Sequence, residues 1–240
     1  AEIIETHWPE VSLSLSSEVC PEIREYERFS TTCANAYIQP LLTRYLTDLE
    51  TRRNSLGMSC PMLLMQSGGG LGTLEDALQF PVRLVESGPA GGALLSAEIA
   101  RSFGIEKALS FDMGGTTAKL CIINNGQPRT SREFEVGREY RFLAGSGLPL
   151  RLPVIEMVEI GAGGSSIASL DELGRIAVGP RSAGSEPGPA CYGRGGVEPT
   201  VTDADVALGR ILSDGFATGD LNFSQADSVA SIENNLLRTE

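Results

Sequence analysis

Apolar residues recur at spacings of three and four over residues 32–53, which is the pattern of one apolar helix face. Pro40 falls inside this stretch, so it must kink the helix or lie near its start. The apolar run 61–66 then predicts a short strand, and the glycine-rich stretch 67–72 after it is expected to form only loop. Helix, strand and loop are therefore predicted for this part of the chain.

Residues typical of helix ends predict the next two helices. Thr73, followed three residues later by Asp76, predicts an N-cap for a short helix that ends before the next proline. The SGPAGG stretch at 87–92 is expected to be a loop that leads into a helix over 93–103. Gly104 fits the C-terminal stop of that helix, because glycine readily adopts the left-handed conformation required there.

The hydrophobic period changes to two from residue 108 onward. Alternation over 108–113 and an apolar run at 119–123 predict a β-hairpin, with Gly114 and Gly115 between the strands and a turn at 124–126. Further strands are predicted at 134–142, 153–160, 166–170 and 175–178, the last two joined by a turn at 171–174. A helical first hundred residues and a strand-rich remainder together predict a mixed α/β fold.

The region 179–200 contains glycine, proline, serine and arginine without any period, so we expect a long ordered loop or the lining of a site. Thr202 and Asp205 predict the cap of a helix that runs to about residue 211. Apolar spacing over 226–236 predicts one last helix.

Composition narrows the class of protein. The 240 residues suffice for one or two domains with a buried core. A net charge of −12 disfavours nucleic acid and anionic membranes as partners. No apolar run is long enough to span a membrane and no secretory signal precedes the first helix, so a cytoplasmic location is expected. The five cysteines form no CxxC pair, which predicts free buried thiols rather than a disulfide framework.

The sequence lacks the residues that several common kinds of catalytic site require. His7 is the only histidine, which excludes a Ser-His-Asp triad, a histidine-rich metal site and an HExxH helix. The only lysines are Lys107 and Lys119, and neither follows the GxxxxG of a P-loop. Any phosphate site must therefore be built from backbone amides, hydroxyl groups and a metal ion held by carboxylates.

The DMGGTT segment at 112–117 supplies those parts. Asp112 ends a predicted strand and can hold Mg²⁺ through water. Gly114 and Gly115 let the backbone turn and approach an anion closely, and Thr116 and Thr117 add donors. A hairpin turn with a surface aspartate explains the same residues equally well, so both interpretations stay open.

A second glycine-rich segment follows the strand predicted at 153–160. Its Gly161, Gly163 and Gly164 resemble a dinucleotide-binding turn, but that turn must open a helix, and too few residues separate it from the turn at 171–174. A glycine loop between strands can still admit the edge of an adenine or a phosphate. The alternative is a packed glycine turn without a ligand.

Short motifs also carry a resemblance to a known family. Each is weak alone, but they occur in the family's order and include the long segments SGPAGG at 87–92 and PGPACYGRGG at 187–196. The chain resembles the hydantoinase A and 5-oxoprolinase family, which also includes acetone carboxylase subunits. The other matching motifs are YER at 26–28, STT at 30–32, NAY at 35–37, QSGG at 66–69, DMGGTT at 112–117, IGAGG at 160–164, GP at 179–180 and PTVTDA at 199–204.

The resemblance implies an actin-like ATPase core of the ribonuclease-H type, in which two lobes each grip the nucleotide with one phosphate loop. Residues 1–106 would complete the first lobe and the inter-lobe region, and residues 107–240 would form the strand-rich second lobe. No Asp-x-Gly-Gly-Thr precedes residue 110, so the chain is expected to be a piece of a longer protein, truncated at its C-terminal side too. The family often has glycine at the position of Ser165 and aspartate at that of Lys119, so neither residue is assigned a role.

The function implied by the resemblance is that of an ATP-dependent cyclic-amide hydrolase. ATP would phosphorylate the amide carbonyl oxygen of a hydantoin or 5-oxoproline, and water would then open the ring. The expected cofactors are ATP and Mg²⁺, the expected partner is a hydantoinase B-type subunit or domain, and the isolated chain is expected to be inactive. Asp112 would be the catalytic metal ligand, Gly114, Gly115, Thr116 and Thr117 would contact phosphates, and Gly161, Gly163 and Gly164 would pack near the nucleoside.

Two alternative functions stay open. One is an ATP-dependent carboxylase subunit of the acetone carboxylase type, which the motifs do not separate from the hydrolase. The other is a non-catalytic domain that binds a partner subunit through its acidic surface. Asp203 and Asp205 are candidates for the ring-opening base, although a helix N-cap and first-turn role explains both better.

Overall fold

The computed structural model describes residues 1–138, 145–211 and 223–237. The chain forms two compact units, of which unit 1 comprises Ala1–Ser110 and Cys121–Met157, and unit 2 comprises Phe111–Leu120 and Val158–Glu240. This division differs from the predicted segments 1–106 and 107–240 chiefly in residues 121–157, which pack with the helical part. Among the described residues, no helix has the length and apolarity needed to cross a membrane.

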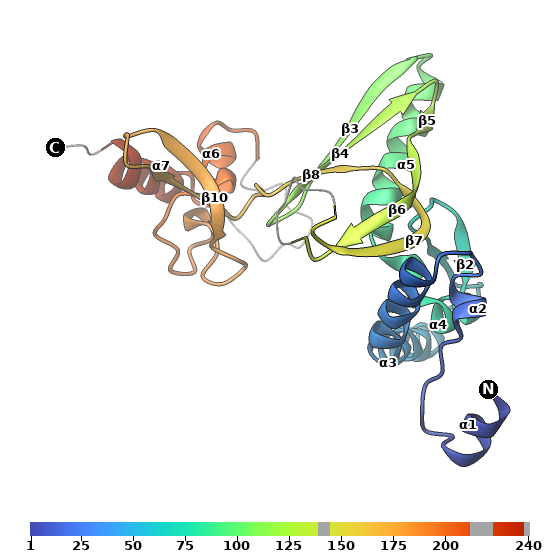
Figure 1. Cartoon of the computed structure of the whole chain (residues 1–240). Helices are drawn as coiled ribbons and strands as arrows, with labels where there is room; N and C mark the ends of the chain where they lie inside the picture. The colour runs from blue at the N-terminus through green and yellow to red at the C-terminus, as the bar shows by residue number, and fades with distance from the viewer. Residues whose placement is uncertain (139–144, 212–222, 238–240) are drawn as a thin grey trace. The chain divides into compact units, whose positions relative to one another are not determined.

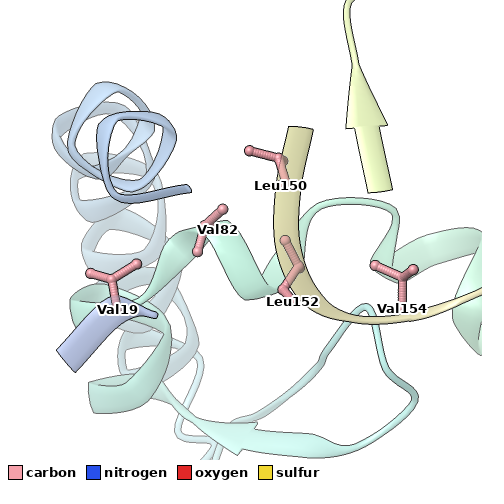
Figure 2. Packing of buried hydrophobic residues seen from close by; sticks show 5 residues of the cluster. All are labelled: Val19, Val82, Leu150, Leu152 and Val154. Atoms are coloured by element: carbon pink, nitrogen blue, oxygen red, sulfur yellow. The ribbon is translucent and has the colours of Figure 1, made fainter. Parts of the chain in front are cut away.

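Unit 1 contains the long helix α3 (Glu25–Ser55), drawn in blue in Figure 1. The helix extends beyond the predicted 32–53, and Pro40 lies in its interior rather than near its start. Its residues Ala34 and Ile38 pack against a core that joins helix α2 (Ser16–Val19), the 3₁₀ turn η1 (Pro81–Leu84) and strand β7 (Leu148–Ile155). Figure 2 shows the buried side chains of this core, which are Val19, Val82, Leu150, Leu152 and Val154.

Buried polar side chains fix α3 in place. The backbone N–H of Arg151 donates to Thr31 Oγ1 over 2.8 Å. Asn35 donates from Nδ2 to the carbonyl of Gln79, and its Oδ1 accepts from the backbone N–H of Val82. Because buried polar atoms are costly without partners, these bonds explain the STT and NAY segments structurally.

In the remaining helices of unit 1, one predicted N-cap is confirmed and one predicted first residue is wrong. Thr73 and Asp76 form a capping box at helix α4 (Leu74–Gln79), as predicted. Helix α5 (Ser87–Ser102) begins at Ser87 rather than at residue 93, because proline and small residues are tolerated in a first helical turn. It ends before Gly104, which has φ +66°, as predicted. The N-terminal helix α1 spans Glu2–His7.

Among the described residues the strands form four small sheets, and several predicted boundaries shift. Strands β1 (Leu63–Met65) and β2 (Leu71–Thr73) pair antiparallel, so the stretch 67–72 is not only loop. Strand β3 (Lys107–Met113) pairs with β4 (Ala118–Asn124), which confirms the hairpin, and β4 also pairs with β5 (Gln127–Pro128) and β8 (Val158–Ile160). Strand β6 (Thr130–Val136) pairs with β7, and β9 (Ser166–Leu170) pairs with β10 (Ile176–Ser182).

These pairs change two predicted strands. The strand expected at 134–142 begins at Thr130, and its positions 139–142 lie outside the described residues. The strand expected at 153–160 is interrupted, because β7 ends at Ile155 and β8 starts at Val158. Helix α5 lies along the sheet of β3, β4 and β5 (Figure 1), and its Ala97 and Ala100 pack on Ile123 near the end of β4, away from the β3–β4 loop.

Unit 2 carries the remaining helices. The predicted loop at 179–200 contains the end of β10 and the short 3₁₀ turn η2 (Ala190–Tyr192). Helix α6 (Val201–Ala207) is capped by Thr200 and Asp203, not by Thr202 and Asp205, and it ends before the predicted 211. Helix α7 (Gln225–Ile232) and the π-helical turn η3 (Glu233–Leu237) occupy the predicted last helix.

Candidate functional site

Every candidate residue singled out for the phosphate site lies in unit 2. Loop 1 (Asp112–Thr117) comprises the end of β3 and the connection to β4, and loop 2 (Gly161–Ser166) comprises the connection from β8 and the first residue of β9. The antiparallel pairing of β4 with β8 sets Ala118 opposite Ile160, so loop 1 ends and loop 2 begins at the same end of one strand pair. Loop 1 and loop 2 are therefore neighbours although more than forty residues separate them in sequence.

Hydrogen bonds lock the two loops together. The backbone N–H of Gly164 donates to the carbonyl of Gly114 over 2.9 Å, and that of Ser165 donates to the carbonyl of Gly115 over 2.7 Å. Within loop 2, the N–H of Gly163 donates to Ser166 Oγ over 2.8 Å. The carbonyl oxygens of Gly114 and Gly115 thus point at loop 2 and accept hydrogen bonds from it.

Three consecutive amides of loop 1 have no such partners, whereas the backbone N–H of Gly114 donates to the carbonyl of Thr117 over 2.9 Å. The backbone N–H groups of Gly115, Thr116 and Thr117 donate to no other described residue, and the two threonine hydroxyls also form no hydrogen bond there. Gly115 and Thr116 are exposed to solvent. Consecutive free backbone amides and hydroxyl groups are a donor set suited to an anion. Loop 1 therefore presents free donors to solvent, and binding of phosphate there stays a prediction.

Packing explains why two of the glycines in loop 2 lack side chains. A Cβ at Gly163 would lie 2.6 Å from backbone atoms of Gly115 and Thr116, and one at Gly164 would lie 2.7 Å from Thr202 Oγ1. Neither residue has a positive φ. The cause is therefore close approach to loop 1 and to α6, whereas contact of loop 2, including the half-buried Gly161, with a nucleoside stays a prediction.

The glycines of loop 1 are different. A Cβ at Gly114 would meet its nearest atom at 3.5 Å, and one at Gly115 at 3.6 Å, which are ordinary van der Waals distances. Their φ angles are not positive either. The fold itself therefore does not require glycine at these two positions, which leaves room for a ligand as the reason.

Asp112 lies at the start of loop 1 with an exposed side chain that pairs with no other described residue. No group of three or more His, Cys, Asp or Glu suited to a metal ion exists among the described residues. Mg²⁺ usually keeps several waters and takes one or two carboxylates together with substrate phosphates. A single exposed carboxylate in the same loop as free hydroxyls and amides fits that donor set.

A charged pair lies behind the loops on β4 and β8. Lys119 stands opposite Glu159 in the antiparallel register. Burial lowers the pKa of Lys119, and the negative charge of Glu159 opposes that shift. Because the lysine follows loop 1 by two residues, its charge belongs to the electrostatic surroundings of that loop.

Asp203 is fully buried and serves the fold. Its Oδ2 accepts from the backbone N–H groups of Ala190 and Thr200 and from Thr200 Oγ1, and its Oδ1 accepts from the N–H of Cys191 and from Ser228 Oγ. These five bonds leave no accessible oxygen for water or substrate. Asp203 thus ties the PGPACYGRGG segment to α6 and α7, and it is not placed to act as a ring-opening base.

The neighbours of Asp203 share this buried setting. Burial raises the pKa of the Cys191 thiol to about 12, and the nearby Asp203 carboxylate adds to the shift. Cys191 is therefore a protonated, unreactive thiol, in agreement with the expectation of buried cysteines for this position, whereas Cys33 and Cys60 are exposed. Asp205 is only half buried and lies 3.4 Å from Arg210 in an ion pair.

One structural link escaped the sequence interpretation. Thr202 donates from its backbone N–H and from Oγ1 to the carbonyl of Gly164, over 2.8 and 2.9 Å. The spacing of Thr200 and Asp203 fits a capping box and would have predicted the start of this helix. It sets Thr202 one position after the first helical residue. The contact with loop 2 itself has no local sequence signal.

The sequence profile of the hydantoinase/oxoprolinase family matches residues 28–234. The chain belongs to this family, as the motifs indicated.

Three relatives illustrate the similarity. An uncharacterized protein of Methanocaldococcus jannaschii is 44% identical over 213 residues, which cover 88% of this chain and 31% of that protein. The caprolactamase subunit alpha of Pseudomonas jessenii is 38% identical, with 95% of this chain and 32% of that protein covered. The acetophenone carboxylase gamma subunit of Aromatoleum aromaticum is 32% identical, with 95% and 30% covered. The chain thus spans about a third of the length of each relative.

Two solved structures are similar in fold. The ATP-dependent caprolactamase of Pseudomonas jessenii aligns with a TM-score of 0.69 at 36% identity, covering 96% of this chain and 32% of that chain. A nucleotide-free acetone carboxylase aligns with a TM-score of 0.74 at 24% identity, covering 98% and 32%. The second likeness concerns the fold alone.

Proposed function

We propose that this chain is the part of an ATP-dependent cyclic-amide hydrolase that holds the phosphates of ATP at loop 1. In this reaction the γ-phosphoryl group of ATP is transferred to the amide carbonyl oxygen of a hydantoin or 5-oxoproline-like ring. Water then attacks the activated carbon, the ring C–N bond breaks, and phosphate leaves. The fold that would carry this reaction is the second lobe of an actin-like ATPase.

The observation that carries the proposal is the set of free donors in loop 1. The carbonyl oxygens of Gly114 and Gly115 accept hydrogen bonds from loop 2, and the amides of Gly115, Thr116 and Thr117 remain available to phosphate oxygens. Donors fixed in advance stabilise developing charge without reorganisation during the reaction. Such positioning, rather than covalent chemistry, supplies most of the catalysis in phosphoryl transfer.

Asp112 is the residue of this chain that would hold Mg²⁺. Bound Mg²⁺ would neutralise negative charge on the transferred phosphoryl group. The Asp112 carboxylate suits this role because it is exposed and has no competing partner among the described residues. A carboxylate already paired with an arginine would be a poorer metal ligand. The hydroxyls of Thr116 and Thr117 complete the polar lining of the loop.

In the full-length protein, we expect Asp112→Asn to lower ATP turnover at least about tenfold, which corresponds to roughly 1.4 kcal/mol of transition-state stabilisation. The physical reason is the loss of one negative metal ligand while the side-chain shape is kept. Phosphate release in a coupled assay measures turnover, and circular dichroism checks that the fold is intact. The control is Glu172→Gln in the exposed β9–β10 turn, which removes a charge from the same unit.

If the Asp112→Asn variant turns over ATP at the wild-type rate, Asp112 is not a ligand of the catalytic metal ion. Absence of Mg-ATP binding by the wild-type protein in calorimetric titration would reject the enzyme proposal and favour the non-catalytic domain.

A carboxylase of the acetone carboxylase type is the second candidate, favoured by the 32% identity to the acetophenone carboxylase gamma subunit. The higher identity to the caprolactamase subunit, 38%, supports the hydrolase. Two assays distinguish these functions. Ring opening of hydantoin, 5-oxoproline or caprolactam supports the hydrolase, whereas bicarbonate-dependent ATP hydrolysis with a ketone supports the carboxylase.

We also propose that a hydantoinase B-type subunit binds the outer face of α3, defined by Tyr26, Phe29, Tyr37, Leu41 and Tyr45. The side chains of Tyr37 and Leu41 are 86% and 68% exposed, although they follow one another along a single helix face. Exposed aromatic and aliphatic residues in one stripe are typical of an interface. The names of two relatives, subunit alpha and gamma subunit, support a multi-subunit assembly.

When the full-length protein is co-expressed with a hydantoinase B-type subunit, we expect the double substitution Tyr37→Glu and Leu41→Glu to reduce co-purification at least about tenfold, because charges are costly in an interface core. The melting temperature should not change, since both side chains are exposed. Leu173→Glu, at another exposed leucine, is the matched control. Equal recovery of the partner with both variants would exclude this face.

A further inference from the structure

A continuous path of hydrogen bonds joins the first turn of α6 to loop 1. Thr202 donates to the carbonyl of Gly164 from both its backbone N–H and its Oγ1. The N–H of Gly164 in turn donates to the carbonyl of Gly114. The next residue repeats the link, because the N–H of Ser165 donates to the carbonyl of Gly115. Movement of the Gly164 peptide must therefore shift the backbone of loop 1.

The helix end of this path is firmly anchored. Asp203, next to Thr202, is fully buried and accepts hydrogen bonds from the backbone of Ala190 and Cys191 and from the hydroxyl of Ser228. Thr202 itself is buried. The first turn of α6 thus cannot follow loop 2 if loop 2 moves, so it acts as a fixed support.

The contact between Thr202 and loop 2 is also tight. A Cβ built on Gly164 would lie 2.7 Å from Thr202 Oγ1, so the hydroxyl occupies the space beside this glycine. A methyl group in place of Oγ1 would need about 3.3–3.6 Å to a carbonyl oxygen, whereas the hydroxyl stands at 2.9 Å. Replacing the hydroxyl by a methyl group would therefore both remove a bond and push the Gly164 carbonyl away.

We propose that Thr202 is a positioning residue for the phosphate loop: its hydroxyl sets the place of the Gly164 peptide and, through it, the direction of the free amides of Gly115, Thr116 and Thr117. The proposal rests on the proposed function, because it assigns Thr202 to the same ATP site. Thr202 touches no phosphate itself. Its effect arises because displacements well below 1 Å already weaken preorganised donors.

The test compares Thr202→Val with Thr202→Ser in the full-length protein. We expect Thr202→Val to raise the Mg-ATP dissociation constant and the KM for ATP at least about fivefold, the value of one lost hydrogen bond. Thr202→Ser keeps the donor and should stay within about twofold of the wild type. Calorimetric titration gives the dissociation constant, and phosphate release gives kcat and KM.

Ser231→Ala is the matched control. Ser231 is also a buried hydroxyl of unit 2 that donates to a loop carbonyl, that of Val197, but it belongs to α7 and makes no bond to loop 1 or loop 2. It should lower the melting temperature about as much as Thr202→Val, because each variant loses one bond, and leave Mg-ATP affinity unchanged. If Thr202→Val does not fold, Thr202→Ala, which adds no methyl against Gly164, takes its place.

The proposal is overturned if Thr202→Val or Thr202→Ala binds Mg-ATP like the wild type while melting earlier, since the hydroxyl would then only stabilise the fold. It is also overturned if Thr202→Ser is as weak as Thr202→Val. The proposed function fails in a different way, namely if the wild-type protein binds no Mg-ATP at all, and the role of Thr202 falls with it.

Discussion

Replacing Gly163 by valine is expected to lower the free energy of unfolding of unit 2 by about 3 kcal/mol or more, the upper range for overpacking a rigid site. The new Cβ would lie 2.6 Å from backbone atoms of Gly115 and Thr116, which cannot move aside without breaking the bonds between the two loops. Thermal unfolding of the full-length protein without nucleotide measures the effect.

Gly115→Ala is the matched control for this prediction. Its Cβ would meet its nearest atom at 3.6 Å, so the melting temperature should stay close to that of the wild type. If phosphate approaches the loop as proposed, the same variant should nevertheless lose Mg-ATP affinity. A Gly163→Val protein that melts like the wild type would contradict the packing of the two loops, and a Gly115→Ala protein with full affinity would contradict close approach of the phosphate.

Asp203→Ala is expected to destabilise the protein by about 4 kcal/mol, because the change leaves several buried donors without an acceptor. The N–H groups of Ala190, Cys191 and Thr200 lose their partners at once. Chemical denaturation of the full-length protein measures the loss. Labelling of the Cys191 thiol at pH 8 should become faster in this variant, since local opening exposes it.

The comparison with Asp205→Ala isolates the effect of burial. Asp205 also lies in α6, but its ion pair with Arg210 is partly exposed. Such pairs contribute about 0–1 kcal/mol, so this variant should unfold nearly like the wild type. Equal losses for the two variants would show that the helix, and not the buried carboxylate, carries the stability. Ring-opening activity retained in Asp205→Ala would exclude that residue as the base.

Local sequence chemistry predicted the elements whose causes lie within a few residues. The capping box of Thr73 and Asp76, the stop at Gly104 and the turn between β9 and β10 are confirmed because each depends on neighbouring backbone groups. The hairpin of β3 and β4 is confirmed for the same reason. The order of short motifs also sufficed to indicate the family, since it requires no spatial information.

Errors arose where two local signals competed. The glycines of SGPAGG favoured a loop, but Pro89 is compatible with a first helical turn, and packing of Ala90 and Ala93 against Cys121 and Ile155 decides for helix. At α6, Thr202 and Asp205 have the spacing of a cap, and so do Thr200 and Asp203. The second pair prevails because the Asp203 carboxylate also finds the buried amides of Ala190 and Cys191.

The sequence by itself determined the mixed α/β class, the candidate loops and the residue types available to bind phosphate. Only the tertiary structure decided that loop 1 and loop 2 interlock, that Gly163 is small because of Gly115 and Thr116, and that Asp203 is a buried support rather than a base. The reason is that these properties depend on contacts between segments distant in the chain. The residues next to a position in sequence therefore do not indicate which distant backbone segment packs against it.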